Sequence, residues 1–390
     1  MTLIAIHLLQ NHAPSNLNRD DNGDPKDALF GGVRRARISS QALKRSIRWA
    51  DSFRAAFADT PNLLAQRTQL LPEQVRERLT GLDLADEVKT AIVQAAARLG
   101  KGENKPAPEV AEGAEESKKG KKGKKGPADT SVVERVKTAQ LMFLTTAEID
   151  QLAAKLTQIV REQGLDTFNG LSGDKLVAAI GEYEPHAADI AMFGRMTTSS
   201  PFKNVEAAVQ VAHALSTHAV EQEFDFYTAV DDISGEAGAG FIGETTFNSA
   251  TYYKYLSIDW GGLIKNLQGD TAVAALTVQA LIRAALFAIP SGKQNSFAAH
   301  NLPDLALVEV RPQQIALSYA NAFVKPVRAS AQHSLIAASA EALQSYIPQI
   351  NGMYNLKAER AFLSSVPFAL EGATHLASLD ELLGWLPLGA

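Results

Sequence analysis

The sequence contains no cysteine among its 390 residues. Its composition therefore excludes disulfides, thiolate-bound zinc, cysteine-ligated iron–sulfur clusters and cysteine nucleophiles. No apolar run approaches the roughly 18 residues of a membrane-spanning helix. The first residues also lack the basic region and the small-residue cleavage site of a secretory signal. We therefore expect a cytoplasmic protein that has no membrane partner.

Common catalytic signatures are missing as well. The sequence has no P-loop, no G-x-S-x-G motif and no dinucleotide-binding glycine fingerprint. Its eight histidines are scattered, and His213 and His218 are five residues apart, which does not match the i, i+4 spacing of a helical metal pair. We expect His7, within an apolar segment, to be a core residue and His12 to be polar scaffolding or a base. We expect no cofactor and no metal.

Composition and charge limit the class of protein. Hydrophobic residues make up 46% and charged residues 21% of the chain, as in a globular protein, and the length predicts two or three modules. The net charge is −5. Any affinity for nucleic acid must therefore arise from local clusters of basic residues, because the chain as a whole does not attract a polyanion.

One such cluster lies in the stretch RRARISSQALKRSIR. Six Lys/Arg and no Asp/Glu lie between Val33 and Arg48. Ser39 and Ser40 stand where a helix N-cap is expected, and the helix should continue to about Phe53. Four polar or basic side chains then fall at i, i+3, i+4 and i+7 on one helical face: Gln41, Lys44, Arg45 and Arg48. Opposite them, Leu43, Ile47 and Ala50 should face the core.

This basic face favours binding of a polyanion. A helix start attracts anions through its unpaired N–H groups and its dipole, and side chains along the helix extend this into a track. The preceding segment, residues 30–35, extends the same positive charge upstream. An ordinary basic helix is more often a solvated amphipathic helix. We nevertheless favour a nucleic-acid partner.

The other segments predict an α+β fold. Leu3–Gln10 and Leu305–Val310 are expected strands, and the first should be central because it is apolar on both faces. The segment Thr145–Glu148 has the pattern of a capping box before a helix. Asp270–Ile289 and Ser330–Tyr346 are expected helices. Residues 101–127 combine glycine with blocks of opposite charge, which predicts disorder.

Two β-rich segments around a glycine-rich tip predict a projecting hairpin. They are Phe224–Val230 and Phe241–Tyr255, and the tip spans residues 234–240. The hairpin carries several aromatic residues, which could stack on bases together with Met196 or could simply hold the hairpin together.

Several blocks of sequence resemble the CasC family, the repeated backbone subunit of type I-E CRISPR Cascade complexes. The blocks are HAPSNLNRDDNGDPKDALFGGVRRARISSQALKRSIR, IAMFGRM at 190–196, AHALSTH at 212–218, DFYTAVDD at 225–232 and SYANAFVKPV at 318–327. They occur in the family's order along nearly the whole chain. The resemblance is weakest from 55 to 180.

The resemblance implies a hand-shaped fold. A ferredoxin-like (RRM-like) palm would comprise residues 1–54, 185–220 and 251–390. Helical fingers would be inserted at 55–184, and residues 221–250 would form a β-hairpin thumb. Copies of the chain would stack along the spacer of a CRISPR RNA (crRNA), each thumb displacing one base and leaving the others free to pair with target DNA.

The resemblance also implies which residues bind RNA and which partners are present. Phosphate contacts would come from Arg19, Lys26, Ser39, Gln41, Lys44, Arg45 and Arg48, with Lys325 and Arg328 as further candidates. Met196, Tyr227 and Thr228 occupy the positions at which the family kinks the RNA. Further partners would be the small, large, 5′-handle and repeat-processing subunits of Cascade. The subunit itself would not be an enzyme, since a recruited helicase-nuclease cuts the DNA.

Two alternatives remain open. The first is a metal-dependent endoribonuclease, because clustered carboxylates beside Arg19 could hold Mg²⁺ or act on a ribose 2′-OH: Asp20, Asp21, Asp24 and Asp27. Loop aspartates also cap turns and balance arginines, which is the interpretation that we favour. The second is an RNA-binding domain outside CRISPR systems, which the ordered set of blocks argues against.

Overall fold

The structure, a computed structural model, describes residues 3–99, 135–199, 201–229, 232–233 and 241–389. The segment expected to be disordered, 101–127, and the glycine-rich tip at 234–240 lie outside these residues. The chain divides into two compact units. The sheet unit comprises Met1–Pro61, Ala191–Phe193 and Ala207–Ala390, and the helical unit comprises Asn62–Ile190 and Gly194–Glu206.

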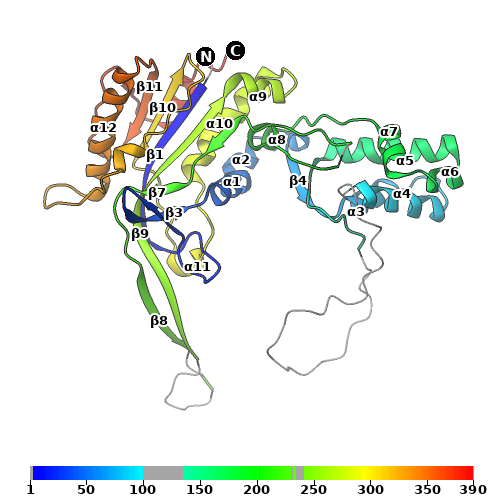
Figure 1. The fold of residues 1–390 in the computed structure, drawn as a ribbon, viewed down its shortest axis with the longest axis horizontal. Coiled ribbons are helices and arrows are strands. Elements are labelled where there is room, and N and C mark those ends of the chain that lie inside the picture. Colours follow the sequence, from blue (N-terminus) through cyan, green and yellow to red (C-terminus); the bar gives the residue numbers. More distant parts are fainter. Residues whose placement is uncertain (1–2, 100–134, 200, 230–231, 234–240, 390) are drawn as a thin grey trace. The chain divides into compact units, whose positions relative to one another are not determined.

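The sheet unit contains a mixed sheet with the strand order β12-β11-β10-β1-β9-β7-β3-β2, with β6 and β8 also paired to β9 (Figure 1). The strands are β1 (Leu3–Ser15), β2 (Asp27–Phe30), β3 (Val33–Ile38), β6 (Val209–Val211), β7 (Ala214–Ser216), β8 (Glu223–Ala229), β9 (Phe241–Asp259), β10 (Leu305–Arg311), β11 (Glu359–Ser364) and β12 (Ala373–His375). The α+β fold and the central position of the first strand are confirmed, because β1 lies between β9 and β10.

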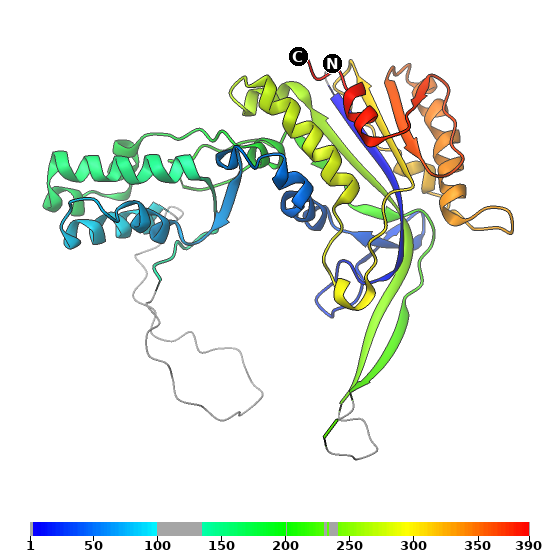
Figure 2. The ribbon, with the colours of Figure 1, turned by 180° about the vertical axis from the view of Figure 1, so that it is seen from behind.

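Helices cover both faces of this sheet. They are α1 (Ser40–Trp49), α2 (Asp51–Ala55), α9 (Trp260–Asn266), α10 (Thr271–Phe287), α11 (Gln294–Phe297), α12 (Leu335–Met353), α13 (Leu379–Trp385) and a 3₁₀ turn at Ala320–Phe323. Leu343 and Ile347 of α12 join a buried cluster with Leu3, Leu305 and Leu307 on one face. Helix α10 lies over the other face and packs against α1, α2 and α13 (Figure 2).

Several expected boundaries differ from the structure. The helix expected at Ser330–Tyr346 spans Leu335–Met353. The first strand is expected to end at Gln10, but β1 continues to Ser15 because its backbone keeps pairing with β9 as far as Asn248. The basic helix was expected to reach about Phe53. It ends at Trp49, where Ala50 adopts an extended conformation and starts the short helix α2.

Among the residues that the structure describes, the helical unit contains five complete helices, the start of a sixth and a two-stranded sheet. Its elements are a 3₁₀ turn at Pro61–Leu63, β4 (Ala65–Thr68), α3 (Leu71–Arg78), α4 (Asp86–Leu99), β5 (Met142–Thr145), α5 (Thr146–Gln163), α6 (Leu165–Asn169), α7 (Gly173–Ile180) and the start of α8 (Ala188–Phe193). The predicted capping box is confirmed: the Thr145 hydroxyl accepts from the Glu148 N–H, and Glu148 accepts from the Thr145 N–H. In the described part of the chain, none of the helices combines the length and the apolar character needed to span a membrane.

A buried polar network lies on the α12 face of the sheet. Glu309 is fully buried and its carboxylate contacts Arg311 at 2.6 Å and Arg360 at 2.6 Å. The Tyr319 hydroxyl donates to the same carboxylate at 2.8 Å. Burial alone would raise the pKa of Glu309, but His7 and the two guanidinium groups hold it below its ordinary value. Burial lowers the pKa of His7, which is a core residue as expected.

We predict that Glu309→Gln destabilises the protein by about 3–5 kcal/mol, because the change leaves two guanidinium groups without their counter-ion in the core. Urea denaturation would measure this free energy. The matched control is Asp380→Asn, whose partner Arg283 lies 2.8 Å away and whose side chain is 86% exposed. We expect a cost of at most about 1 kcal/mol for the control. Equal effects of the two substitutions would contradict the assignment.

Candidate nucleic-acid interface

Helix α1 presents the basic face that the sequence predicts. The Ser39 hydroxyl accepts a hydrogen bond from the Ala42 N–H at 3.2 Å, so Ser39 is the N-cap. Leu43 and Ile47 are buried, as expected, whereas Ala50 is only partly buried. The other face is accessible to solvent: Gln41 and Arg45 are exposed, and Lys44 and Arg48 are partly exposed. This arrangement leaves a cationic surface that begins at a helix start.

The basic residues upstream of α1 do not all add to its surface charge, in contrast to the prediction. Arg35 is completely buried, and its guanidinium donates to the backbone carbonyls of Phe30, Ser216, Phe323 and Val324. Arg34 forms an ion pair with Asp27 at 2.6 Å. The expectation that residues 30–35 extend the surface charge is therefore wrong for Arg35, because its charge is satisfied inside the fold.

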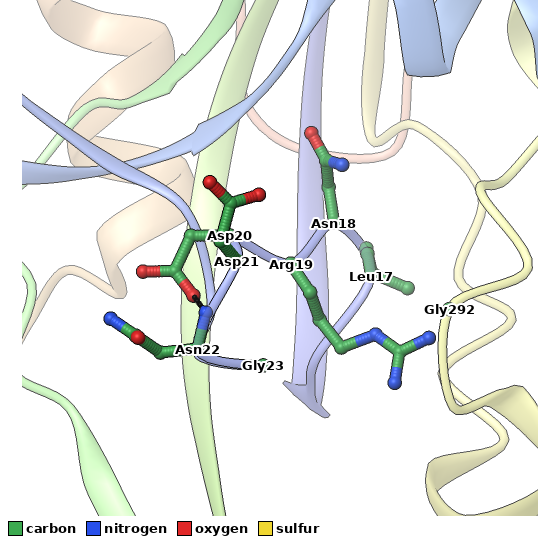
Figure 3. Close-up of a pocket in the computed structure, with 8 residues that line it drawn as sticks. All are labelled: Leu17, Asn18, Arg19, Asp20, Asp21, Asn22, Gly23 and Gly292. Atoms are coloured by element: carbon green, nitrogen blue, oxygen red, sulfur yellow. Dashed lines mark hydrogen bonds between the residues drawn. The ribbon is translucent and has the colours of Figure 1, made fainter. Parts of the chain in front are cut away.

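A loop that follows β1 places Arg19 at the surface. Arg19 lines an open cavity of about 500 Å³ together with Leu17, Gly292 and two acidic residues, Asp20 and Asp21. Figure 3 shows the Arg19 side chain extending towards the segment that carries Gly292, whereas the side chains of Asp20 and Asp21 lie on the other side of the loop. The Arg19 guanidinium therefore points away from the two carboxylates that line the same cavity.

Most of the candidate catalytic aspartates have structural partners. Asp20 accepts hydrogen bonds from the N–H groups of Asn22 at 2.9 Å and Asp24 at 3.0 Å. Asp24 accepts from the Thr246 hydroxyl at 2.5 Å, and Asp27 pairs with Arg34. Within the described residues no group of three or more acidic or histidine side chains has the geometry of a metal site. This arrangement matches turn capping and charge balance.

Lys26 lies near Arg37 and His213, and four aspartates line the same cavity as Lys26 and Arg37: Asp20, Asp21, Asp24 and Asp27. The Arg37 guanidinium lies 3.3 Å from Nδ1 of His213, and Arg37 also donates to the Asp27 carbonyl at 2.9 Å. Partial burial, followed by the charges of Arg37 and Lys26, lowers the pKa of His213. Because Arg37 and His213 are 176 residues apart in the sequence, no local signal could have paired them.

Two further histidines, His12 and His218, are structural. His12 is buried, and burial, together with the charge of Lys254, lowers its pKa to about 3. A neutral, inaccessible imidazole cannot act as a base on a bound strand, so His12 is scaffolding. Nδ1 of His218 donates to the Ala219 carbonyl at 2.8 Å, and Nε2 accepts from the Thr251 N–H at 3.3 Å.

The predicted hairpin is present, and its two faces differ. Strand β8 pairs with the outer part of β9 in the register Phe226↔Glu244, Tyr227↔Gly243 and Thr228↔Ile242 (Figure 1). Side chains alternate across the strands, so Phe224, Phe226, Thr228 and Ile242 share one face. Tyr227 lies on the opposite face. Tyr227 and Thr228 therefore cannot both contact an RNA segment that lies on one face of the hairpin.

Tyr227 packs directly over the glycine opposite it. A Cβ atom placed on Gly243 would lie 2.4 Å from the Tyr227 ring, so any other residue at 243 would require the ring to move from this position. The ring is 49% exposed. It therefore offers a fixed aromatic surface to solvent.

The base of the hairpin is tied to the loop that carries Arg19. Asn16 donates from Nδ2 to the carbonyls of Gly23 at 2.9 Å and Thr246 at 3.0 Å. Thr246 in turn donates to Asp24, and the Lys293 ammonium contacts the hydroxyl of Thr245. Phe297 of α11 contacts the ring of Phe247. No local pattern indicates the role of Lys293, because nothing near it in the sequence marks a contact with a strand 48 residues away.

Met196 belongs to the helical unit, where its side chain is 94% exposed. The residue before it explains this exposure. Arg195 is buried, forms an ion pair with Glu148 at 2.7 Å and donates to the Lys203 carbonyl at 2.7 Å. The turn is thus anchored by Arg195 while Met196 projects from it.

Lys325 and Arg328 are exposed in the segment after the 3₁₀ turn at Ala320–Phe323. The guanidinium of Arg35 holds this segment through the Phe323 and Val324 carbonyls. Lys325 is therefore fixed beside the β2–β3 hairpin, whereas Arg328 lies further along an irregular segment.

Comparisons with known proteins cover nearly the whole chain. One solved chain, from a structure described as "CRISPR RNA-guided surveillance complex, pre-nicking", is 28% identical with a TM-score of 0.76, covering 98% of this chain and 99% of that one. A second, from a "CRISPR RNA-guided surveillance complex", is 23% identical with a TM-score of 0.69 over the same shares and indicates a shared fold. No curated protein matches the sequence. A family model described as "CT1975-like protein" matches residues 4–385, so the chain belongs to the family of CT1975-like proteins.

Proposed function

We propose that this protein is a non-catalytic backbone subunit of a Cascade-type CRISPR surveillance complex and that it binds the guide RNA through its phosphates. The observation that carries the proposal is the solvent-accessible basic face of α1, which starts at a capped helix N-terminus. The likeness to a chain of a CRISPR RNA-guided surveillance complex over 98% of the sequence supports it.

Binding through phosphates suits a guide-holding protein. Such a protein must accept any spacer, and contacts to phosphate position a strand without reading its bases. The side chains that supply these contacts are the candidates already described: Arg19, Lys26, Ser39, Gln41, Lys44, Arg45, Arg48, Lys325 and Arg328. Ser39 is largely buried as the N-cap, so its contribution would come from the helix start that it organises.

The finer assignments extend the same proposal. In a type I-E complex the sheet unit would be the ferredoxin-like palm, the helical unit the fingers and the β8–β9 hairpin the thumb. Copies would polymerise along the crRNA beside the small, large, 5′-handle and repeat-processing subunits in the cytoplasm. Tyr227, Thr228 and Met196 would displace bases at intervals, leaving the rest to pair with target DNA.

We predict that Lys44→Ala combined with Arg48→Ala weakens binding of single-stranded RNA and flattens its salt dependence. Each lost phosphate contact should reduce the log–log salt slope by roughly 0.7, so the pair should reduce it by roughly 1.4. Fluorescence anisotropy with labelled RNA over a salt series would measure the slope.

The control for this experiment removes the same net charge elsewhere in the sheet unit. Arg283→Ala with Lys265→Ala changes α10 and α9 and should leave the slope unchanged, because neither helix belongs to the basic face. An unchanged slope in the α1 variant, or equal slopes in the two variants, would show that α1 is not the binding surface.

We also predict that Tyr227→Ala in the assembled complex retains RNA binding but weakens the regular spacing of its nuclease protection pattern. The substitution removes the fixed ring over Gly243 and leaves the basic face of α1 intact. Tyr354→Ala, at another exposed tyrosine, is the control. Identical footprints for Tyr227→Ala and the unmodified protein would argue against a role of the hairpin in displacing bases.

The absence of nuclease activity has its own test. We expect the assembly to leave complementary RNA intact in the presence of Mg²⁺, because Asp20, Asp24 and Asp27 have structural partners. Gel electrophoresis of the RNA gives the result. Regular cleavage that disappears in Asp21→Ala or Asp27→Ala would favour the endoribonuclease instead.

A further inference from the structure

A second cavity lies along the flank of α1. Its volume is about 640 Å³, within the range that accommodates small ligands. Helix α1 lines it with residues spaced i, i+3, i+4 and i+7, which share one side of the helix: Ala42, Arg45, Ser46 and Trp49. The end of α10 and the segment after it supply the opposite wall, with Phe287, Pro290 and His300 among its residues.

Two aromatic rings in this cavity are unusually accessible. Trp49 is 57% exposed and Phe287 is 45% exposed, although both adjoin the core of the sheet unit. The Arg54 guanidinium lies 4.9 Å from the centre of the Trp49 ring. Exposed aromatic rings beside cationic groups are the surface on which nucleobases stack, since each base has a π-face.

The cavity adjoins the cavity that Arg19 lines. Leu17 and Gly292 line both this cavity and the cavity that contains Arg19. A Cβ atom on Gly292 would lie 2.4 Å from the Leu17 carbonyl oxygen and 2.6 Å from that of Asn16, so glycine is needed where the two cavities meet. Arg45 belongs both to the basic face of α1 and to this cavity.

We propose that this cavity holds one nucleobase of the bound strand, stacked against Trp49, while Arg45 contacts the adjoining phosphate. The inference rests on the proposed function, and it adds a base-holding subsite on the helix that grips the backbone. The lining combines two rings and small side chains with the charged residues Arg45 and Asp51. A ring accepts any base through its face, so the subsite keeps binding independent of sequence. The exposed rings, and the position of Arg45 on both the basic face and the cavity, favour a nucleotide over a peptide segment.

The test compares two single-stranded RNAs of equal length, one with all its bases and one with abasic residues at regular positions. Both carry the same phosphates, so only stacking distinguishes them. We expect Trp49→Leu in the full-length chain to weaken binding of the base-bearing strand by about tenfold and to leave binding of the abasic strand unchanged. Trp49→Phe retains a ring and should recover most of the loss.

Two further variants keep the result interpretable. Tyr354→Leu removes an exposed ring at the end of α12 and should change neither affinity. Phe287→Leu, in the opposite wall, should repeat the selective loss and serves as a second test should Trp49→Leu not fold.

The outcomes distinguish the two proposals. Equal effects of Trp49→Leu on the two strands, or no effect on either, would overturn the base-holding subsite and leave phosphate binding intact. If the unmodified protein binds neither strand in a salt-dependent manner, the proposed function itself is wrong.

Discussion

The long strand β9 is the element on which the arrangement of the sheet unit depends. Its inner part pairs with β1 in an unbroken register from Leu3↔Asp259 to His12↔Ala250, and its outer part pairs with β8 in the hairpin. Both faces of the inner part are buried, so a slip of one residue would move every side chain into the packing of the opposite face. The packing of the inner part of β9 in the hydrophobic core therefore sets the point at which the hairpin leaves the sheet and the direction in which it begins.

The basic residues between Arg34 and Arg48 have two different roles. Arg35 is buried in the sheet unit, where four backbone carbonyl groups accept hydrogen bonds from its guanidinium and compensate its charge. Lys44, Arg45 and Arg48 remain along α1, one helix further on. In a chain with a net charge of −5, this division matters, because only the charges that reach solvent can attract a polyanion. A count of basic residues thus overstates the binding surface.

Local patterns were enough to predict a large part of this fold. The N-cap at Ser39, the capping box at Thr145 and the central strand β1 depend on neighbouring residues or on a simple apolar period, and all three are confirmed. The burial of Arg35, the contact between Lys293 and Thr245 and the pairing of Arg37 with His213 join segments far apart in the sequence. No single-sequence pattern records such contacts, because the spacing of residues says nothing about which segments meet.

The contact between Tyr227 and Gly243 links the identities of two positions across the hairpin. Any side chain at 243 would occupy the volume of the aromatic ring, and a smaller residue at 227 would leave the glycine backbone uncovered. Related proteins should therefore vary at these two positions in concert. We expect relatives with an aromatic residue at 227 to have glycine at 243. Relatives without an aromatic residue at 227 should tolerate other residues at 243.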